Sequence, residues 1–117
     1  MNLVANVLVV LVAVLHLGFL ALEMFLWDHP FGRKTFRMTP EYSKASATLA
    51  ANQGLYNGFL AAGLLWGLIT ANTSVEIFFL VCVVVAGIYG GFTAKRSILY
   101  MQALPGLLAL LAVVFSR

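Results

Sequence analysis

Long apolar stretches, separated by short polar breaks, run along the whole chain. Each stretch is close to the roughly 20 residues that an α-helix needs to cross a bilayer. The stretches lie at about 3–27, 45–69, 74–94 and 97–115. We therefore predict that residues 1–117 form a single all-α integral membrane domain, a bundle of four transmembrane helices.

The breaks between the stretches mark the predicted helix ends. The first break holds Pro30 and Pro40 and is expected to be the one long loop. Thr73 and Glu76 have the spacing of a capping box, which predicts that the third helix starts at this point. Pro105 lies near the middle of the fourth stretch, where its missing backbone donor is expected to kink the helix.

The composition excludes a water-soluble fold. Of the 117 residues, 62% are hydrophobic and 9% are charged, whereas soluble domains carry about 25% charged residues. The first stretch has no basic region before it and no small-residue cleavage site after it, so we interpret it as a retained span. Cys82 is the one cysteine, which excludes an intramolecular disulfide, and the net charge of +3 does not indicate nucleic-acid binding.

The basic residues predict an orientation. The loop after the first helix and the loop after the third helix together hold six Lys and Arg residues, whereas the opposite side holds only Arg117. The six are Arg33, Lys34, Arg37, Lys44, Lys95 and Arg96. Since Lys and Arg accumulate in cytoplasmic loops, both loops are predicted to be cytoplasmic and both termini outside. The protein would then be a multi-pass component of the cell's inner membrane.

Polar side chains within the predicted helices gather in the cytoplasmic half of the bilayer. Glu23 lies about one turn from the end of the first helix, and His16 lies seven residues earlier on the same face. The other helices add Asn52, Gln53, Tyr56, Asn57, Tyr89, Thr93, Tyr100 and Gln102. An acid that faces lipid at the bilayer centre costs roughly 2.5–3.5 kcal/mol. We therefore expect these side chains to line a polar chamber open to the cytoplasm.

A structural interpretation of the same residues competes with the chamber. Asn, Gln and Tyr side chains also join transmembrane helices through interhelical hydrogen bonds. A satisfied core histidine is a common state for a residue such as His16. Three glycine pairs with GxxxG spacing form a second pattern, because such pairs let helices approach closely, within one protomer or between protomers. They predict tight packing of the second and third helices. The pairs are Gly54/Gly58, Gly63/Gly67 and Gly87/Gly91.

Motifs of soluble enzymes are missing from the sequence. It has no phosphate loop, no nucleophile elbow and no dinucleotide fingerprint. It also has no Cys/His cluster, and His16 and His29 do not have the spacing of a zinc pair. No metal site is therefore expected.

Two longer segments resemble known families. "LEMFLWDHPFGRKTF" and "AANQGLYNGFLAAGLLWG" are similar to the signature segments of a family of small bacterial four-span membrane proteins known only as a domain of unknown function. That resemblance covers nearly the whole chain and implies no activity.

A more distant resemblance is to the membrane-associated proteins in eicosanoid and glutathione metabolism. "GRKTFRMTPE" is similar to their cytoplasmic loop, and "KRSILYMQALPGLLAL" is similar to the start of their fourth helix. The resemblance implies that Arg96, Ser97 and Tyr100 serve glutathione binding and catalysis, in homotrimers with sites between protomers. The second helix of those proteins carries an arginine and a glutamate around an asparagine, whereas "LAANQGLYN" keeps only the asparagine.

These observations lead to a first functional hypothesis, a cytoplasm-facing site for a small amphipathic or lipophilic molecule. Its candidate catalytic residues are Arg96, Tyr100, Glu23 and His16, and its candidate binding residues are Asn52, Gln53, Tyr56, Asn57 and Ser97. Glutathione is the cofactor that the distant resemblance implies, since a nearby arginine stabilises a thiolate. The bilayer and further copies of the chain, in a trimer by that resemblance, are the expected partners. A transport or binding subunit without chemistry, and a structural partner of a larger membrane complex, are the alternatives.

Overall fold

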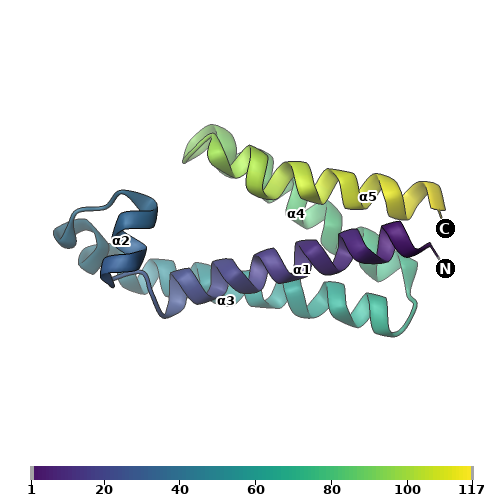
Figure 1. Ribbon diagram of the computed structural model, residues 1–117, viewed down its shortest axis with the longest axis horizontal. Coiled ribbons are helices and arrows are strands. Elements are labelled where there is room, and N and C mark those ends of the chain that lie inside the picture. Colours follow the sequence, from purple (N-terminus) through teal and green to yellow (C-terminus); the bar gives the residue numbers. More distant parts are fainter. Residues whose placement is uncertain (1, 117) are drawn as a thin grey trace. The chain divides into compact units, whose positions relative to one another are not determined.

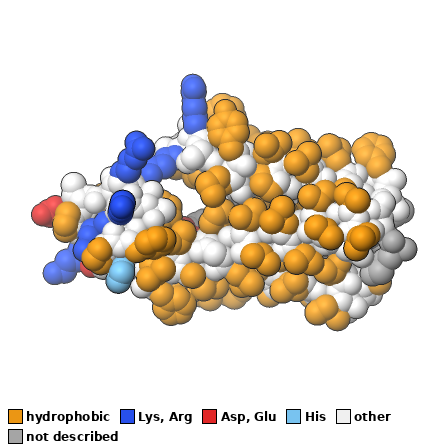
Figure 2. Space-filling model, viewed as in Figure 1, with side chains coloured by type: hydrophobic (Ala, Val, Ile, Leu, Met, Phe, Trp, Pro, Cys, Tyr) orange, Lys and Arg blue, Asp and Glu red, His pale blue; other side chains and the backbone are white. Residues whose placement is uncertain are grey.

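All regular elements of the computed structural model, which describes residues 2–116, are helical. They follow one another along the chain (Figure 1) as α1 (Leu3–Met24), α2 (Pro30–Phe36), α3 (Pro40–Ile69), α4 (Thr73–Thr93), the π-helical turn η1 (Leu99–Ala103) and α5 (Leu104–Ser116). Within residues 2–116, three segments are long and apolar enough to cross a membrane, namely Leu3–Met24, Thr73–Thr93 and Leu99–Ser116. Hydrophobic side chains cover most of the visible surface of the long helices (Figure 2). The prediction of an all-α chain is thus confirmed.

Two prolines that were expected to lie in a loop between helices begin helices instead. Pro30 is the first residue of α2, and the His29 ring accepts a backbone N–H of that helix at 3.1 Å. Pro40 is the first residue of α3, and the Thr39 hydroxyl accepts a backbone N–H at 3.2 Å. Proline suits the first position of a helix because its φ is already helical and its missing N–H has no partner there. The predicted long loop therefore contains a seven-residue helix.

The start of α4 differs from the predicted capping box. Asn72 is the N-cap, since its side-chain oxygen accepts the N–H of Val75 at 3.2 Å. Thr73 is instead the first residue of the helix. Glu76 is buried, with only 1% of its surface exposed. The sequence pattern therefore located the helix start to within a residue but not the environment of the acid.

A π-helical turn precedes the proline of the last helix. The N–H of Leu104 donates to the carbonyl of Leu99, five residues earlier. Pro105 has no N–H to donate, and its ring would clash with the carbonyl four residues before it in a regular α-helix. A π-turn changes the local register of the backbone. The irregularity predicted at Pro105 thus lies on its N-terminal side.

The described residues form two compact units. The first unit contains residues 2–15 and 60–116, and the second contains residues 16–59. The core of the first unit consists of small and β-branched side chains together with two leucines. Its members are Ala5, Val9, Val12, Ala13, Ala61, Leu64, Leu80, Val83, Ala109 and Val113. Small side chains favour close contact between helices where lipid supplies no hydrophobic driving force.

Glycines set the distance between α3 and α4 in the first unit. A Cβ placed on Gly63 would collide with the ring of Phe79. A Cβ placed on Gly67 would lie 3.0 Å from the backbone nitrogen of Glu76. The Gly63/Gly67 pair therefore packs α3 against α4, as its spacing predicted.

The other two glycine pairs contact different helices. A Cβ on Gly87 would lie 2.7 Å from the backbone nitrogen of Ala103, and a Cβ on Gly91 would overlap Leu99. This register, in which later residues of α4 meet earlier residues of η1, makes the two segments antiparallel. The Gly54/Gly58 pair faces α1 in the second unit. Packing between α3 and α4 was therefore predicted from three pairs, but only one of them provides it.

We expect Gly87→Ala to lower the free energy of unfolding by about 1–3 kcal/mol, the usual cost of overpacking. The added methyl group would meet the backbone of Ala103, which cannot turn away. Thermal unfolding of the purified protein in detergent measures the effect.

Gly18→Ala is the matched control, because a Cβ there has no neighbour within 4 Å. It should leave the melting temperature unchanged or raise it through better helix propensity. Equal melting temperatures for the two variants would contradict the close approach.

Candidate functional site

The glycines of "ANQGLYNG" bring α1 and α3 together in the second unit. A Cβ on Gly54 would lie 2.7 Å from the Met24 side chain and 3.0 Å from Cβ of Glu23. A Cβ on Gly58 would lie 2.6 Å from the Leu20 side chain. These positions permit a contact between the helices that a larger residue would prevent. The polar side chains beside them can therefore reach across the contact.

Asn57 and Glu23 meet at this contact. The Asn57 amide donates a hydrogen bond from Nδ2 to Oε1 of Glu23 at 2.5 Å, although the two residues are 34 positions apart. Asn57 is buried, with 6% of its surface exposed, and Glu23 is half-buried. An unpartnered buried polar group costs about 1–3 kcal/mol, so each side chain stabilises the placement of the other. The structure thus joins two of the predicted site residues.

The remaining polar residues of this stretch of α3 point elsewhere. Asn52, Gln53 and Tyr56 are exposed, and the Tyr56 ring meets Phe59 edge-on with 5.7 Å between the ring centres. Asn52 and Tyr56 are four residues apart and share the helix face opposite Gly54. Asn57 is therefore the member of the group that packs toward α1.

His16 occupies the start of the second unit. It is fully buried, and its ring meets Phe19 edge-on at 5.2 Å. Seven residues separate it from Glu23 along α1, so the two side chains project from the same side of the helix. The structure places His16 in a packed environment rather than on an open surface.

A second polar cluster, which the sequence pattern did not predict, fixes α2. The Ser43 hydroxyl donates to Oδ1 of Asp28 at 2.7 Å, and Nη1 of Arg33 donates to the same oxygen at 3.0 Å. The Trp27 indole donates to the Ser46 hydroxyl at 2.9 Å. These bonds tie the connection before α2 to the first turns of α3. Asp28 directly before a basic segment was a signal for the Arg33 bond only, because Ser43 is 15 positions away along the chain.

The partners of Asp28 hold the pKa of its carboxyl below the ordinary value of 3.8. The Ser43 hydrogen bond is the largest cause, and the Arg33 hydrogen bond and charge act in the same direction. Desolvation acts in the opposite direction but is outweighed. The cluster therefore favours the ionised carboxylate.

Arg96, Ser97 and Tyr100 belong to the first unit. All three are exposed, and they lie in the turn after α4 and the start of η1. Tyr100 lines a depression of about 260 Å³ between α4 and the η1–α5 segment, together with apolar side chains such as Ile88 and Leu107. Its phenol therefore stands beside an apolar surface.

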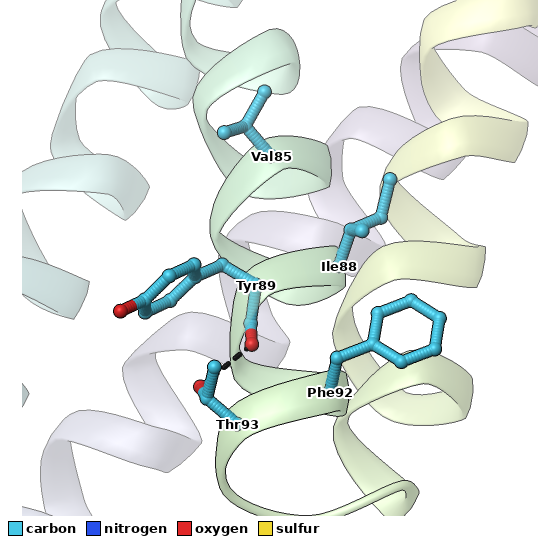
Figure 3. Close-up of a pocket in the computed structure, with 5 residues that line it drawn as sticks. All are labelled: Val85, Ile88, Tyr89, Phe92 and Thr93. Carbon is cyan, nitrogen blue, oxygen red and sulfur yellow. Dashed lines mark hydrogen bonds between the residues drawn. The ribbon is translucent and has the colours of Figure 1, made fainter.

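Two further polar side chains of the first unit bond to helix backbone. The Gln102 amide donates to the carbonyl of Val83 at 3.3 Å, and the Thr93 hydroxyl donates to the carbonyl of Tyr89 at 2.7 Å. Figure 3 shows Tyr89 and Thr93 at an open depression of about 420 Å³ on α4, whose other lining residues are Val85, Ile88 and Phe92. The Gln102 bond joins η1 to α4, as the structural interpretation expects of Gln102, whereas the Thr93 bond stays within α4.

Glu76 is the acid that the sequence analysis assigned to a cap alone. It is buried in the first turn of α4 beside Gly67. A carboxyl within an apolar helix that follows a three-residue break was the missed signal. Among residues 2–116, no group of three or more His, Cys, Asp or Glu side chains is placed to hold a metal ion.

We expect the protection of α2 against hydrogen exchange to depend on Asp28. A carboxyl whose pKa is lowered by folding stabilises the fold above its unfolded pKa, near 3.8, and this contribution disappears as the pH falls through the folded pKa. Protection factors of residues 31–36, which correct for the intrinsic rate, should be constant from pH 7 to about 5 and fall in stronger acid. Asp28→Asn should reduce these protection factors several-fold at pH 7 and abolish their fall in acid, the acid step.

Glu41→Gln is the matched control, because it removes an exposed carboxylate from the first turn of α3 without touching this cluster. It should keep the acid step. A step of the same size in Asp28→Asn would show that Asp28 does not hold α2.

The chain is similar to proteins of one known family. The family model described as "Protein of unknown function (DUF1304)" matches residues 10–114. The protein named "Uncharacterized protein YpaA" from Lactococcus lactis subsp. lactis (strain IL1403) is 29% identical over 119 residues, which cover 98% of this chain and 100% of that protein. No solved structure matches the chain significantly. Because the family match spans most of the sequence, this protein belongs to the DUF1304 family.

Proposed function

We propose that the chain crosses the membrane four times. α3 is then a span in addition to the three segments that are apolar enough to cross by themselves. α3 has 30 residues and is therefore about 45 Å long, which exceeds the roughly 30 Å of a hydrocarbon core. Gly54 and Gly58 pack it against α1, and Gly63 and Gly67 pack it against α4. Because α1 and α4 are both apolar enough to span a membrane, a helix packed on each of them shares their environment. The six basic residues of the two predicted cytoplasmic loops favour termini on the outer side.

The function that we propose is binding of a small amphipathic molecule at the Glu23–Asn57 pair. The observation that carries the proposal is the hydrogen bond from Asn57 to Glu23 within the apolar helices. Acids inside spanning helices are rare and tend to be functional. The Asn57 amide engages one carboxyl oxygen, which leaves the other able to accept a hydrogen bond from a ligand. A lipophilic molecule with an ammonium or hydroxyl head group meets these requirements.

The surrounding residues suit such a ligand. Gln53 is exposed and lies one turn before Asn57 on α3, where it offers a donor and an acceptor near the pair, whereas Asn52 and Tyr56 lie on the opposite face of the helix. His16 lies two turns from Glu23 on α1 and would supply polarity or proton transfer. Transport of the bound molecule across the membrane, without any chemistry, is the non-enzymatic form of this proposal. In the structural alternative, the Glu23–Asn57 hydrogen bond only joins the two helices.

A glutathione-dependent activity is the second candidate. It is supported by the position of Tyr100 at an apolar depression, with Arg96 and Ser97 exposed in the preceding turn. Arg96 would attract an anionic or thiolate group, and Tyr100 would donate a hydrogen bond to it. The distant resemblance to the membrane-associated proteins in eicosanoid and glutathione metabolism motivates this candidate.

One titration series separates these candidates. The purified protein in detergent should bind the fluorescent lipophilic amine dansylcadaverine. Glu23→Gln should weaken that binding about tenfold or more, because hydrogen bonds to charged groups contribute about 1.5–3 kcal/mol. Glu41→Gln, which removes an acid outside the pair, should leave the affinity unchanged. Release of the amine from proteoliposomes, abolished by Glu23→Gln, would identify transport.

Other outcomes of these experiments would exclude one candidate or the other. The absence of binding and of release, together with a lowered melting temperature for Asn57→Ala, would leave only the structural alternative. Glutathione with 1-chloro-2,4-dinitrobenzene tests the second candidate in the same preparation. Conjugate formation that falls in Arg96→Gln and Tyr100→Phe would support it, and the absence of conjugate would remove it.

A further inference from the structure

The seven-residue helix α2 has two different faces. Its inner face rests on the preceding connection, because Gly32 is buried and a Cβ there would collide with the backbone of Leu26. Arg33 bonds to Asp28 at 3.0 Å, and the Phe36 ring lies 5.0 Å from that of Trp27. The inner face is thus fully engaged within the second unit.

The outer face of α2 consists of Phe31, Lys34, Thr35 and the following residue, Arg37, all of which are exposed. Phe31 exposes 56% of its surface. The chain on either side adds two more exposed aromatic residues, Phe25 at 73% and Tyr42 at 59%. Cations beside exposed aromatic rings are typical of segments that lie at a membrane surface.

The charge on this surface has one dominant sign. Between Asp28 and Lys44 the sequence holds four basic and two acidic residues. Asp28 is engaged by Arg33. Lys34, Arg37 and Lys44 are then balanced by Glu41 alone. The surface is therefore complementary to an anionic partner.

The outer face is also held in a fixed shape. Arg37 adopts the left-handed conformation, with φ 54°, and its N–H bonds back to the end of α2. The N–H of Met38 donates to the carbonyl of Arg33 at 2.8 Å, which completes a Schellman motif. Together with the Asp28 cluster, this cap keeps Lys34 and Arg37 at one end of a short rigid element. Little ordering is then required when a partner binds.

We propose that the outer face of α2 lies on the membrane surface and binds the head groups of anionic phospholipids. Lys34 and Arg37 bind the phosphodiester, and Phe31 enters the boundary between head groups and acyl chains. The short link from α1, which ends at Met24, keeps this face near the surface that α1 reaches. The inference rests on the proposed membrane location of α1 and α3, but not on the Glu23–Asn57 ligand site.

The test uses the full chain in detergent, titrated with dioctanoyl phosphatidylglycerol, dioctanoyl phosphatidylcholine or glycerol 3-phosphate. Hydrogen exchange of residues 31–38 reports binding. Phosphatidylglycerol should slow exchange, and the other two compounds should not. Lys34→Gln/Arg37→Gln should weaken the apparent affinity about 25-fold, since each charge near an anionic surface contributes about fivefold. Lys34→Arg/Arg37→Lys should retain it.

Matched variants separate the contributions. Phe31→Ala should weaken lipid binding, whereas Phe115→Ala, which removes an aromatic residue that is 83% exposed in α5, should not. Glu23→Gln should keep the lipid effect, so a failure of the ligand site would not appear as a failure here. Three results would overturn the proposal: equal protection by phosphatidylcholine, equal protection by glycerol 3-phosphate, or protection that follows protein concentration instead of lipid. The last result would assign the face to a second copy of the chain.

Discussion

The hydrogen bond from Asn57 to Glu23 is the interaction on which the proposed site depends. In an apolar chain, a carboxyl and an amide that lack partners oppose folding within the membrane. Each provides the partner of the other across α1 and α3. The bond requires the helices to be close, and Gly54 permits that closeness because a side chain there would meet Glu23 and Met24. Packing and polarity are thus coupled at one contact.

Small residues perform the same role in the first unit. Gly87 meets the backbone of Ala103, and Gly63 lies under the Phe79 ring. The π-turn η1 accommodates Pro105 in the helix that packs on Gly87. Lipid provides no hydrophobic force between spans, so such close contacts must contribute dispersion and hydrogen bonding. This explains why glycines occur at the helix contacts of both units.

The helical pattern was predictable because length and hydropathy determine it almost alone. The exceptions have specific physical causes. Pro30 and Pro40 were read as interruptions, although proline equally begins helices, and the caps that decide between these roles are contacts with His29 and Thr39. The burial of Glu76 depends on packing beside Gly67, which no local pattern reveals.

The candidate site was only partly predictable for a related reason. Helical periodicity placed Asn57 in a polar group, but choosing its partner required knowing which face of α3 meets α1. Asn52 is the same residue type five positions earlier, yet it is exposed, whereas Asn57 bonds to Glu23. The Asp28 cluster joins residues 15 positions apart, with the separate helix α2 between them, and helical periodicity predicts no partner across such a break.

A double-mutant cycle between Glu23 and Asn57 tests the central interaction most directly. The free energies of unfolding of Glu23→Ala, Asn57→Ala and the double variant would be measured in mixed micelles. The account predicts a coupling energy of about 1 kcal/mol or more, within the range found for hydrogen bonds between membrane helices. A parallel cycle with Asn52→Ala should be additive to within about 0.5 kcal/mol. Additivity in the Asn57 cycle as well would contradict the account, because the two side chains would then not stabilise one another.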